Sequence, residues 1–186
     1  MPFTFHPVPA LPGLVVVEPH AFADARGRFL ETWKASEFAR HGIAGPFVQD
    51  NTAANPERGT LRGLHFQAPP HAQGKLVRCV RGRAFDVAVD LRPGPTRGRW
   101  HAVDLDAATG RMLWIPPGFA HGYCTLEDDT EVAYKVSGAE YTPAAEGALR
   151  WDDPAIGIRW PVAEPLVAPK DAAAPAWAPD RLPAGW

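Results

Sequence analysis

The sequence has few cysteines, no long apolar run and no excess of one charge, and each absence excludes a class of protein. Only two of its 186 residues are cysteines, which is too few for a disulfide framework. Nineteen Lys and Arg residues against 21 Asp and Glu give a net charge of -2, with both signs interspersed, so there is no electrostatic footprint for nucleic acid. No stretch approaches the roughly 18 apolar residues of a membrane span. We therefore expect neither a nucleic-acid partner nor a membrane partner.

The N-terminus and the two cysteines bear on the cellular location of the protein. The first residues, Met1 to His6, lack a charged segment followed by an apolar run, so no export signal is expected. Cys79 lies in an apolar strand-like run and Cys124 just after a turn. We expect both thiols to be reduced and the protein to be cytoplasmic.

Glycine and proline are plentiful and divide the chain into short β-branched and aromatic runs. This rhythm predicts an all-β jelly-roll (cupin-like) barrel with a few short helices and an irregular C-terminal tail. At 46% hydrophobic residues, the chain is expected to form one domain over residues 1–186, with a barrel core at about 45–150, an N-terminal arm at 1–44 and a C-terminal wrap at 151–186. The predicted strands are Gly13–Val17, Gly27–Thr32, Phe47–Thr52, Gly59–Phe66, Lys75–Arg81, Ala84–Leu91, Arg99–Asp104, Arg111–Ile115, Gly122–Leu126, Thr130–Val136 and Gly147–Arg150.

One short helix is predicted over Ala35–Gly42, with Ser36 as its N-cap and Gly42 as its stop residue. The tail from Ala168 onward is too rich in alanine and proline for a strand, so it is expected to wrap the surface.

Strand parity places several polar side chains, because alternate residues face opposite sides of a sheet. Asp86 lies on the face opposite Phe85 and Val87. Lys75 shares a face with Val77 and Cys79, which directs it either into the barrel or, as a snorkelling first residue, toward solvent. His65 and Arg62 fall on opposite faces, so one site containing both requires a strand irregularity or a neighbouring subunit.

The spacing of the histidines does not match that of a metal-binding barrel. Such barrels supply two histidines on alternate residues of one strand, an acidic ligand soon after, and a third histidine from a later strand. Here Gln67 stands two residues after His65, and no Asp or Glu occurs between His65 and Asp86. His121 therefore lacks partners, and we expect neither a metal nor another cofactor.

Seven blocks in order resemble the dTDP-4-dehydrorhamnose 3,5-epimerase family, over about Glu18 to Lys170. The blocks are Phe47–Asn51, Leu61–Gln67, Gln73–Arg78, Phe85–Arg92, Trp114–Gly122, Tyr134–Lys135 and Trp151–Pro154. The resemblance implies a cupin-type jelly roll, a homodimer and a dTDP-linked 4-keto-6-deoxyhexose as substrate.

The resemblance also implies an assignment of catalytic residues. His65 matches the general base, and Asp171, in the run Pro169–Asp171, matches the carboxylate that orients it. Lys75 matches the cation that stabilises an enolate, and Tyr134 the proton donor on the far face. This set suits inversion of a carbon beside a ketone, which requires removal of a proton, a stabilised enolate and return of a proton to the opposite face.

Substrate contacts are implied in the same way. Two arginines match residues that hold a diphosphate, for which guanidinium groups have the right geometry. The other positions match contacts to the nucleotide or sugar. The full set is Arg26, Glu31, Gln49, Asn51, Arg62, His121, Tyr141, Glu146 and Lys170.

The chain departs from the family pattern after Lys135, where Val136–Pro143 has one residue more and one aromatic fewer. Because this segment follows the expected proton donor, three functions stay open. The first is the 3,5-epimerase of dTDP-rhamnose biosynthesis. The second is an epimerase of one carbon or a ketoisomerase for another deoxysugar, and the third is a non-catalytic nucleotide-sugar-binding module.

Overall fold

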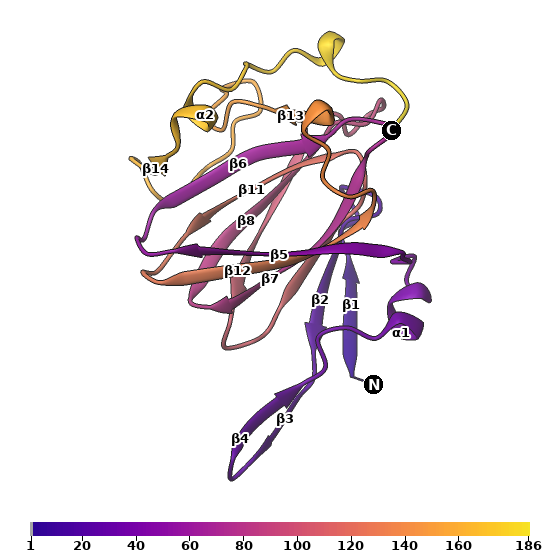
Figure 1. The fold of residues 1–186 in the computed structure, drawn as a ribbon, viewed down its shortest axis with the longest axis vertical. Coiled ribbons are helices and arrows are strands. Elements are labelled where there is room, and N and C mark those ends of the chain that lie inside the picture. Colours follow the sequence, from indigo (N-terminus) through magenta and orange to yellow (C-terminus); the bar gives the residue numbers. More distant parts are fainter. Residues whose placement is uncertain (1) are drawn as a thin grey trace.

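The computed structural model describes residues 2–186, and most of its regular structure is β-strand. Met1, part of the expected N-terminal arm, lies outside the described residues. One sheet has the order β1 (Phe3–Pro7), β2 (Val15–Pro19), β10 (Met112–Ile115), β7 (Gln73–Arg81), β12 (Thr130–Gly138) and β5 (Phe47–Asn55). The second has the order β13 (Glu146–Ala148), β6 (Thr60–Gln67), β11 (Phe119–Thr125), β8 (Arg83–Asp90) and β9 (Trp100–Asp106). Figure 1 shows the two sheets facing each other, which confirms the predicted jelly roll.

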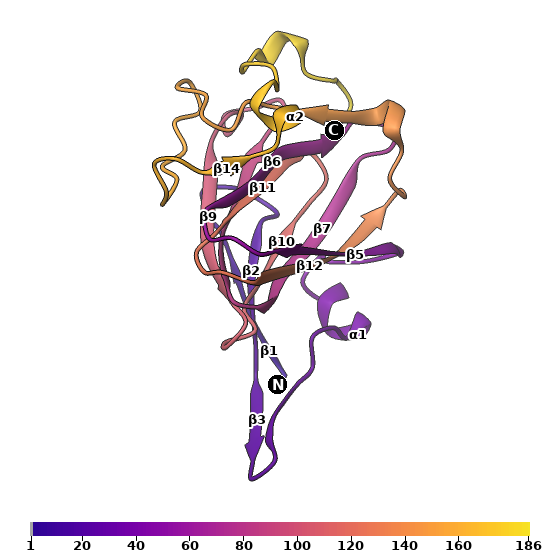
Figure 2. The ribbon, with the colours of Figure 1, turned by 60° about the vertical axis from the view of Figure 1, so that its left-hand side comes forward.

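Four of the remaining elements lie outside these sheets or at their edges. The strands β3 (Ala21–Asp24) and β4 (Gly27–Leu30) form a separate hairpin that projects from the barrel, as both ribbon views show (Figures 1 and 2). The short β14 (Leu166–Val167) pairs in parallel with β6. The helix α2 (Pro169–Ala172) follows it directly.

Alternating residues of both sheets form the barrel interior. Val77 and Cys79 of β7 share one buried cluster with Ala84 and Ala88 of β8, so these two strands face each other across the core. The outer face of the first sheet forms a second cluster with Phe38 of α1 (Ala35–Ala39).

The C-terminal segment covers the outer face of the second sheet. Val87 and Val89 of β8 pack against Ile156, Trp177 and Trp186 of this segment. Figure 1 shows the segment, in yellow, running over β6. The apolar row of β8 is therefore buried beneath the wrap, and the row containing Asp86 faces the barrel interior.

Several sequence predictions require correction. The helix begins at Ala35 with Lys34 at its N-cap position, so Ser36 lies inside the helix and does not cap it. The helix ends at Ala39, three residues before Gly42. Strands β1, β3 and β14 were not predicted. The segment expected as an N-terminal arm divides, because β1 and β2 join the barrel sheet and only the β3–β4 hairpin projects.

Candidate active site

The pairing of β6 with β11 arranges the central residues of the site. His65 lies directly opposite His121, whereas Arg62 lies opposite Tyr123. Two steps along β11 therefore match three steps along β6, which is a bulge. The bulge confirms the expected strand irregularity, and His65 and Arg62 line the same cavity despite their sequence parity.

Two glycines permit this bulge because the backbones of β6 and β11 approach closely. A Cβ atom on Gly63 would lie 2.5 Å from Cα of Gly122, and one on Gly122 would lie 2.8 Å from the carbonyl oxygen of Arg62. Gly63 also has a φ of +131°, which side chains rarely tolerate. Glycine at both positions is therefore a condition of the site's geometry.

Asp171 is the partner of His65. Its Oδ1 lies 2.7 Å from Nε2 of His65, and its Oδ2 accepts a 3.0 Å hydrogen bond from the Gly63 backbone amide. The Asp171 side chain is buried, whereas that of His65 is 32% exposed. Because a carboxylate only accepts, Nε2 of His65 carries the proton and Nδ1 has its lone pair free. The pair is built from residues 106 positions apart, and α2 brings them together.

Lys75 and Tyr134 approach the same space from the other sheet. The Lys75 ammonium lies 5.8 Å from the centroid of the Tyr134 ring. Burial lowers the pKa of Lys75 to about 8, against the attraction of Asp86 and Glu146. Burial also raises the pKa of Tyr134, with nearby Arg62 acting in the opposite direction. At neutral pH the phenol therefore keeps its proton, and most of the lysine is charged.

These groups surround one interior space, formed by two adjoining cavities of about 260 and 330 Å³. His65, Lys75 and Tyr134 line both cavities. His65 belongs to one sheet, and Lys75 and Tyr134 to the other. An imidazole with a free lone pair thus lies on one wall, and a protonated phenol and a cation lie on the opposite wall.

Five of the expected substrate contacts form the rim of this space. Gln49 donates to Asn51 at 2.9 Å and accepts from the Tyr141 backbone amide. Glu146 accepts from the Tyr141 hydroxyl at 3.0 Å and from Lys170 at 2.6 Å. The hydrogen bond to Lys170 holds the pKa of Glu146 below its ordinary value. The rim is therefore polar and fits a ligand with hydroxyl and phosphate groups.

Arg62 is exposed and His121 is buried, and each has a buried polar partner. Arg62 donates to Oδ1 of Asn55 at 2.8 Å, and the Tyr123 hydroxyl donates to the same oxygen at 3.3 Å. Nε2 of His121 lies 2.8 Å from Oδ1 of Asp86, and both side chains are buried.

Asn55, Asp86 and Tyr123 are site residues that the sequence analysis missed. Parity had placed Asp86 opposite the apolar row of its strand, and a carboxylate directed into a barrel core was the available signal. Nothing local in the sequence singled out Asn55 or Tyr123.

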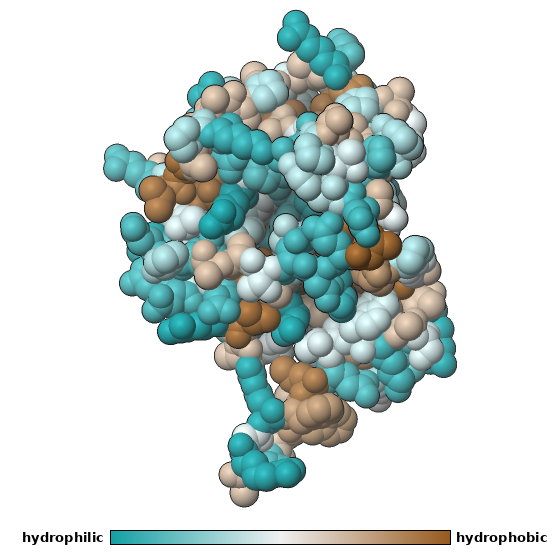
Figure 3. All heavy atoms as spheres, in the orientation of Figure 1, coloured by the Kyte–Doolittle hydropathy of each residue, from teal (hydrophilic) through white to brown (hydrophobic). Residues whose placement is uncertain are grey.

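Arg26 and Glu31 lie away from this space. Arg26 is exposed in the β3–β4 turn and pairs with Asp24. Glu31 lines a separate hollow with Phe22 and Lys34. Figure 3 shows the projecting segment standing clear of the body of the molecule. Within one chain, the structure does not bring these two residues to His65.

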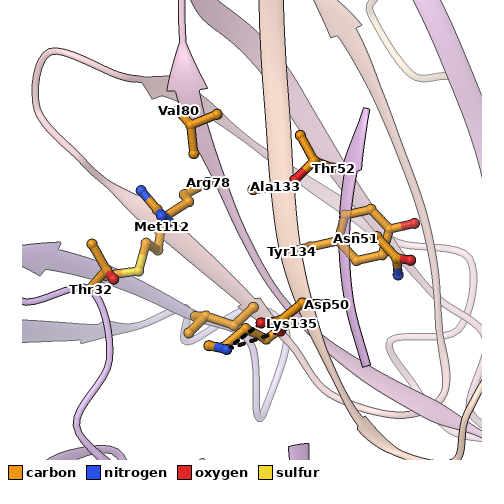
Figure 4. A pocket seen from close by; sticks show the side chains of 11 residues that line it. Thr32, Asp50, Asn51, Thr52, Arg78, Val80, Met112, Ala133, Tyr134 and Lys135 are labelled. Carbon is orange, nitrogen blue, oxygen red and sulfur yellow. Dashed lines mark hydrogen bonds and ion pairs between the residues drawn. The ribbon is translucent and has the colours of Figure 1, made fainter. Parts of the chain in front are cut away.

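Another hollow, of about 340 Å³, opens on the outer face of the first sheet (Figure 4). It contains the ion pair of Lys135 with Asp50 and the side chain of Arg78. No histidine is among the described residues that line it. It lacks a base of suitable strength, so the interior space is the better candidate for acid–base chemistry.

The remaining reactive groups are structural. Cys79 and Cys124 are free and buried, and burial raises their pKa values to about 12 and about 11. Neither is a thiolate at neutral pH. Within residues 2–186, no three His, Cys, Asp or Glu side chains converge in a way that would hold a metal ion.

Comparison with known proteins agrees with this geometry. The family model of dTDP-4-dehydrorhamnose 3,5-epimerase matches residues 9–179. The chain belongs to this epimerase family. The family confirms the resemblance carried by the seven blocks, and it makes the chain an isomerase.

Individual members of the family are similar over most of their length. A dTDP-4-dehydrorhamnose 3,5-epimerase from Sinorhizobium fredii is 50% identical over 147 residues, 78% of this chain and 75% of that protein. A dTDP-4-dehydrorhamnose 3-epimerase from Streptomyces niveus is 40% identical over 162 residues, 86% of this chain and 77% of that protein. The crystal structure of an epimerase from Legionella pneumophila with dTDP-4-keto-L-rhamnose has a TM-score of 0.90 and 38% identity, and covers 97% of each chain.

The described part of this epimerase family member contains no helix of the length and apolarity needed to cross a membrane.

Proposed function

We propose that this chain inverts C3 and C5 of dTDP-4-dehydro-6-deoxy-D-glucose to give dTDP-4-dehydro-L-rhamnose, in dTDP-rhamnose biosynthesis. The observation that carries the proposal is the placement of the His65–Asp171 pair on one wall of the cavity and of Tyr134 on the other. An inversion needs a base and an acid on opposite faces of the reacting carbon, and this arrangement supplies both.

The chemistry requires only proton transfers. Nδ1 of His65 removes the proton beside the C4 ketone, while Asp171 stabilises the imidazolium that forms. The electron pair moves onto the ketone oxygen, and the Lys75 ammonium stabilises the resulting enolate. Tyr134 returns a proton to the carbon from the opposite face, after which the ketone re-forms. We therefore propose a reaction that uses neither a metal nor a cofactor.

The substrate contacts follow from the same placement. Arg62 is positioned to hold the diphosphate, since its guanidinium is anchored on Asn55 beside His65. The exposed Tyr141 at the rim offers a ring on which a base can stack, and Gln49, Asn51, Glu146 and Lys170 offer polar contacts. His121 is positioned to contact the sugar from the floor of the cavity.

A homodimer would bring the two remaining expected substrate contacts, Arg26 and Glu31, to a cavity. Arg26 and Glu31 do not line their own chain's cavities, and the projecting hairpin exposes Phe22 and Phe29, whose exposed fractions are 52% and 65%. Large exposed apolar side chains on a projecting hairpin suit a contact with another chain. We propose that this chain is a second copy, and that the hairpin carries Arg26 to the partner's site. Two free buried cysteines fit a reducing compartment, which supports a cytoplasmic location.

Incubation of the sugar nucleotide with the protein in deuterium oxide tests the reaction. We expect deuterium at both C3 and C5, because each carbon loses its proton to His65 and receives a solvent-derived one. A protein with His65→Ala should incorporate no label above background.

The alternative outcomes of this experiment separate the competing functions. Label at one carbon alone would favour the single-carbon epimerase. This alternative is motivated by the altered segment Val136–Pro143 and by the similarity to a 3-epimerase. A product with the keto group moved to another carbon would indicate a ketoisomerase. Tight binding of dTDP without any exchange would indicate a nucleotide-sugar-binding module.

A further inference from the structure

Asp86 is a fully buried carboxylate whose hydrogen bonding is incomplete. Its Oδ1 accepts from Nε2 of His121 at 2.8 Å, whereas its buried Oδ2 has no hydrogen-bond partner among the described residues. The other inward aspartate of β8, Asp90, differs because Arg92 and Thr96 occupy both of its oxygens. An unsatisfied buried carboxylate oxygen is costly, and the single hydrogen bond to His121 leaves that cost without an explanation.

The fold directs Asp86 and Lys75 into the same interior from opposite sheets. Asp86 stands between Ala84 and Ala88 in the inward row of β8, and Lys75 continues the inward row of Val77 and Cys79 on β7. These two rows pack together in one cluster. The carboxylate and the ammonium therefore face the same low-dielectric space, in which the charge of Asp86 favours the ionised form of Lys75.

Lys75 needs such a counter-charge. Desolvation alone disfavours its ammonium, and the pKa of about 8 results from that burial opposed first by Asp86 and then by Glu146. Without Asp86, a smaller fraction of the lysine would be charged at neutral pH, where it has to stabilise an enolate.

Other ionisable groups also line this space, and they bear on the charge of Lys75. From β6, β11, β12, β13, α2 and the segment between β12 and β13 they are Arg62, His65, His121, Tyr123, Tyr134, Tyr141, Glu146, Lys170 and Asp171. Asp171 is already engaged by His65 and the Gly63 amide, and Glu146 by Lys170 and Tyr141. Asp86 is the carboxylate with an oxygen left free of hydrogen bonds.

We propose that Asp86 is a positioning residue that keeps Lys75 in its charged form and holds His121 with its Nε2 proton directed away from the substrate. The inference rests on the proposed function, because it concerns the cation assigned to the enolate. It adds a second His–Asp pair, His121–Asp86, beside the pair that performs the proton abstraction.

The charge can be tested on the free protein, independently of any turnover. Lysine-selective ¹⁵N NMR follows the titration of the Lys75 ammonium, with Lys75→Met identifying its signal. In Asp86→Asn, which keeps an oxygen for His121 but loses the charge, we expect the Lys75 midpoint to fall by about one pH unit or more. Asp86→Glu, which retains the charge, should leave it within about half a unit of the unaltered protein.

The pH dependence of kcat and KM is measured on the same variants and on a matched control. In Asp86→Asn, the loss of kcat at high pH should begin about one unit lower, with KM changing less than kcat. Asp50→Asn removes a carboxylate that pairs with Lys135 on the outside of the barrel and should change neither profile. Should Asp86→Asn not fold, Asp86→Ser carries the same expectation.

Two results would overturn the proposal. One is an unchanged Lys75 midpoint in Asp86→Asn, and the other is an equal fall in Asp86→Asn and Asp86→Glu, which would indicate packing and not charge. A protein that shows the NMR shift but never exchanges substrate protons would contradict the proposed epimerisation alone.

Discussion

At the scale of single residues, the site depends on which hydrogen bonds and opposite charges stabilise each charged group inside the barrel. Asp171 is buried and uses both oxygens, one on His65 and one on the Gly63 amide. Among the described residues, no carboxylate accepts a hydrogen bond from Lys75, whose charge is favoured by longer-range attraction from Asp86 and Glu146. His65 is therefore oriented by a direct hydrogen bond, whereas the charged form of Lys75 is favoured by carboxylates that do not contact it.

Asp171→Asn should lower kcat by about 10²- to 10⁴-fold with a smaller change in KM. The amide can still contact Nε2 of His65, but it does not stabilise the imidazolium and it permits the wrong tautomer. Steady-state kinetics measure the loss, and Asp152→Asn, an exposed aspartate paired with Arg150, serves as the control. Unchanged kcat in Asp171→Asn would remove Asp171 from the mechanism.

Lys75→Met should abolish turnover and stabilise the fold. Burial holds the folded-state pKa of Lys75 at about 8, below its ordinary value of 10.5, so the charged lysine costs stability at neutral pH. Because part of the side chain is open to the cavity, we expect a gain of about 2 kcal/mol at pH 7.

The sign of the pH dependence follows from the depressed pKa. Above pH 8 the folded protein has already released the proton that the unfolded chain keeps until about 10.5, so the stability of the unaltered protein rises through this window. The advantage of Lys75→Met should therefore shrink between pH 8 and 10.5. Urea unfolding at several pH values measures it, and a constant difference would contradict the assignment.

At the scale of elements, the bulge between β6 and β11 decides which side chains meet. Without it, His65 and Arg62 would face opposite sides of the sheet, as strand parity requires. The two glycines, Gly63 and Gly122, give the backbones the close approach that the bulge needs.

Gly122→Ala should destabilise the protein by about 2 to 4 kcal/mol and reduce turnover at temperatures at which the variant is still folded. The new methyl group would lie 2.8 Å from the Arg62 carbonyl oxygen and 3.1 Å from the Leu64 side chain. Chemical denaturation measures the stability, with Thr4→Ala on the exposed face of β1 as a neutral control. A variant with unaltered stability and activity would show that the strands separate without cost.

At the scale of the whole molecule, a projecting hairpin and a cavity are separated within one chain. Arg26 resembles a phosphate-binding residue of the family, yet its side chain is exposed and does not line the His65 cavities. Its hairpin, β3–β4, projects from the barrel in both ribbon views (Figures 1 and 2). The proposed homodimer reconciles these observations by placing the hairpin at the partner's cavity.

Mixing two inactive variants tests this arrangement. His65→Ala and Arg26→Ala protomers, unfolded together and refolded, should recover about one quarter of the unaltered activity, because half of the dimers are hybrids with one intact site. If Arg26 served its own chain, each hybrid site would carry one defect and the mixture would stay inactive. Light scattering on each variant confirms that it still forms the expected assembly.

The sequence alone was sufficient for features that depend on neighbouring residues. Alternation of apolar and polar residues predicted most strands of the barrel, because the pleat repeats every two residues, but it left Lys75 open between the barrel interior and solvent. The ordered motifs identified the family, and they singled out His65, Lys75 and Tyr134, which the structure brings to one cavity.

Only the tertiary structure decided how distant segments meet. Interstrand register, the contact of Asp171 with His65 over 106 positions, and the presence of Asp86 beneath His121 depend on backbone pairing and packing between residues far apart in the chain. The separation of Arg26 from the cavity also depends on strand pairing. β3 and β4 pair only with each other among the described residues, so their hairpin projects from the barrel. Local periodicity carries no information on these distances, so they emerge only when the two sheets close on each other.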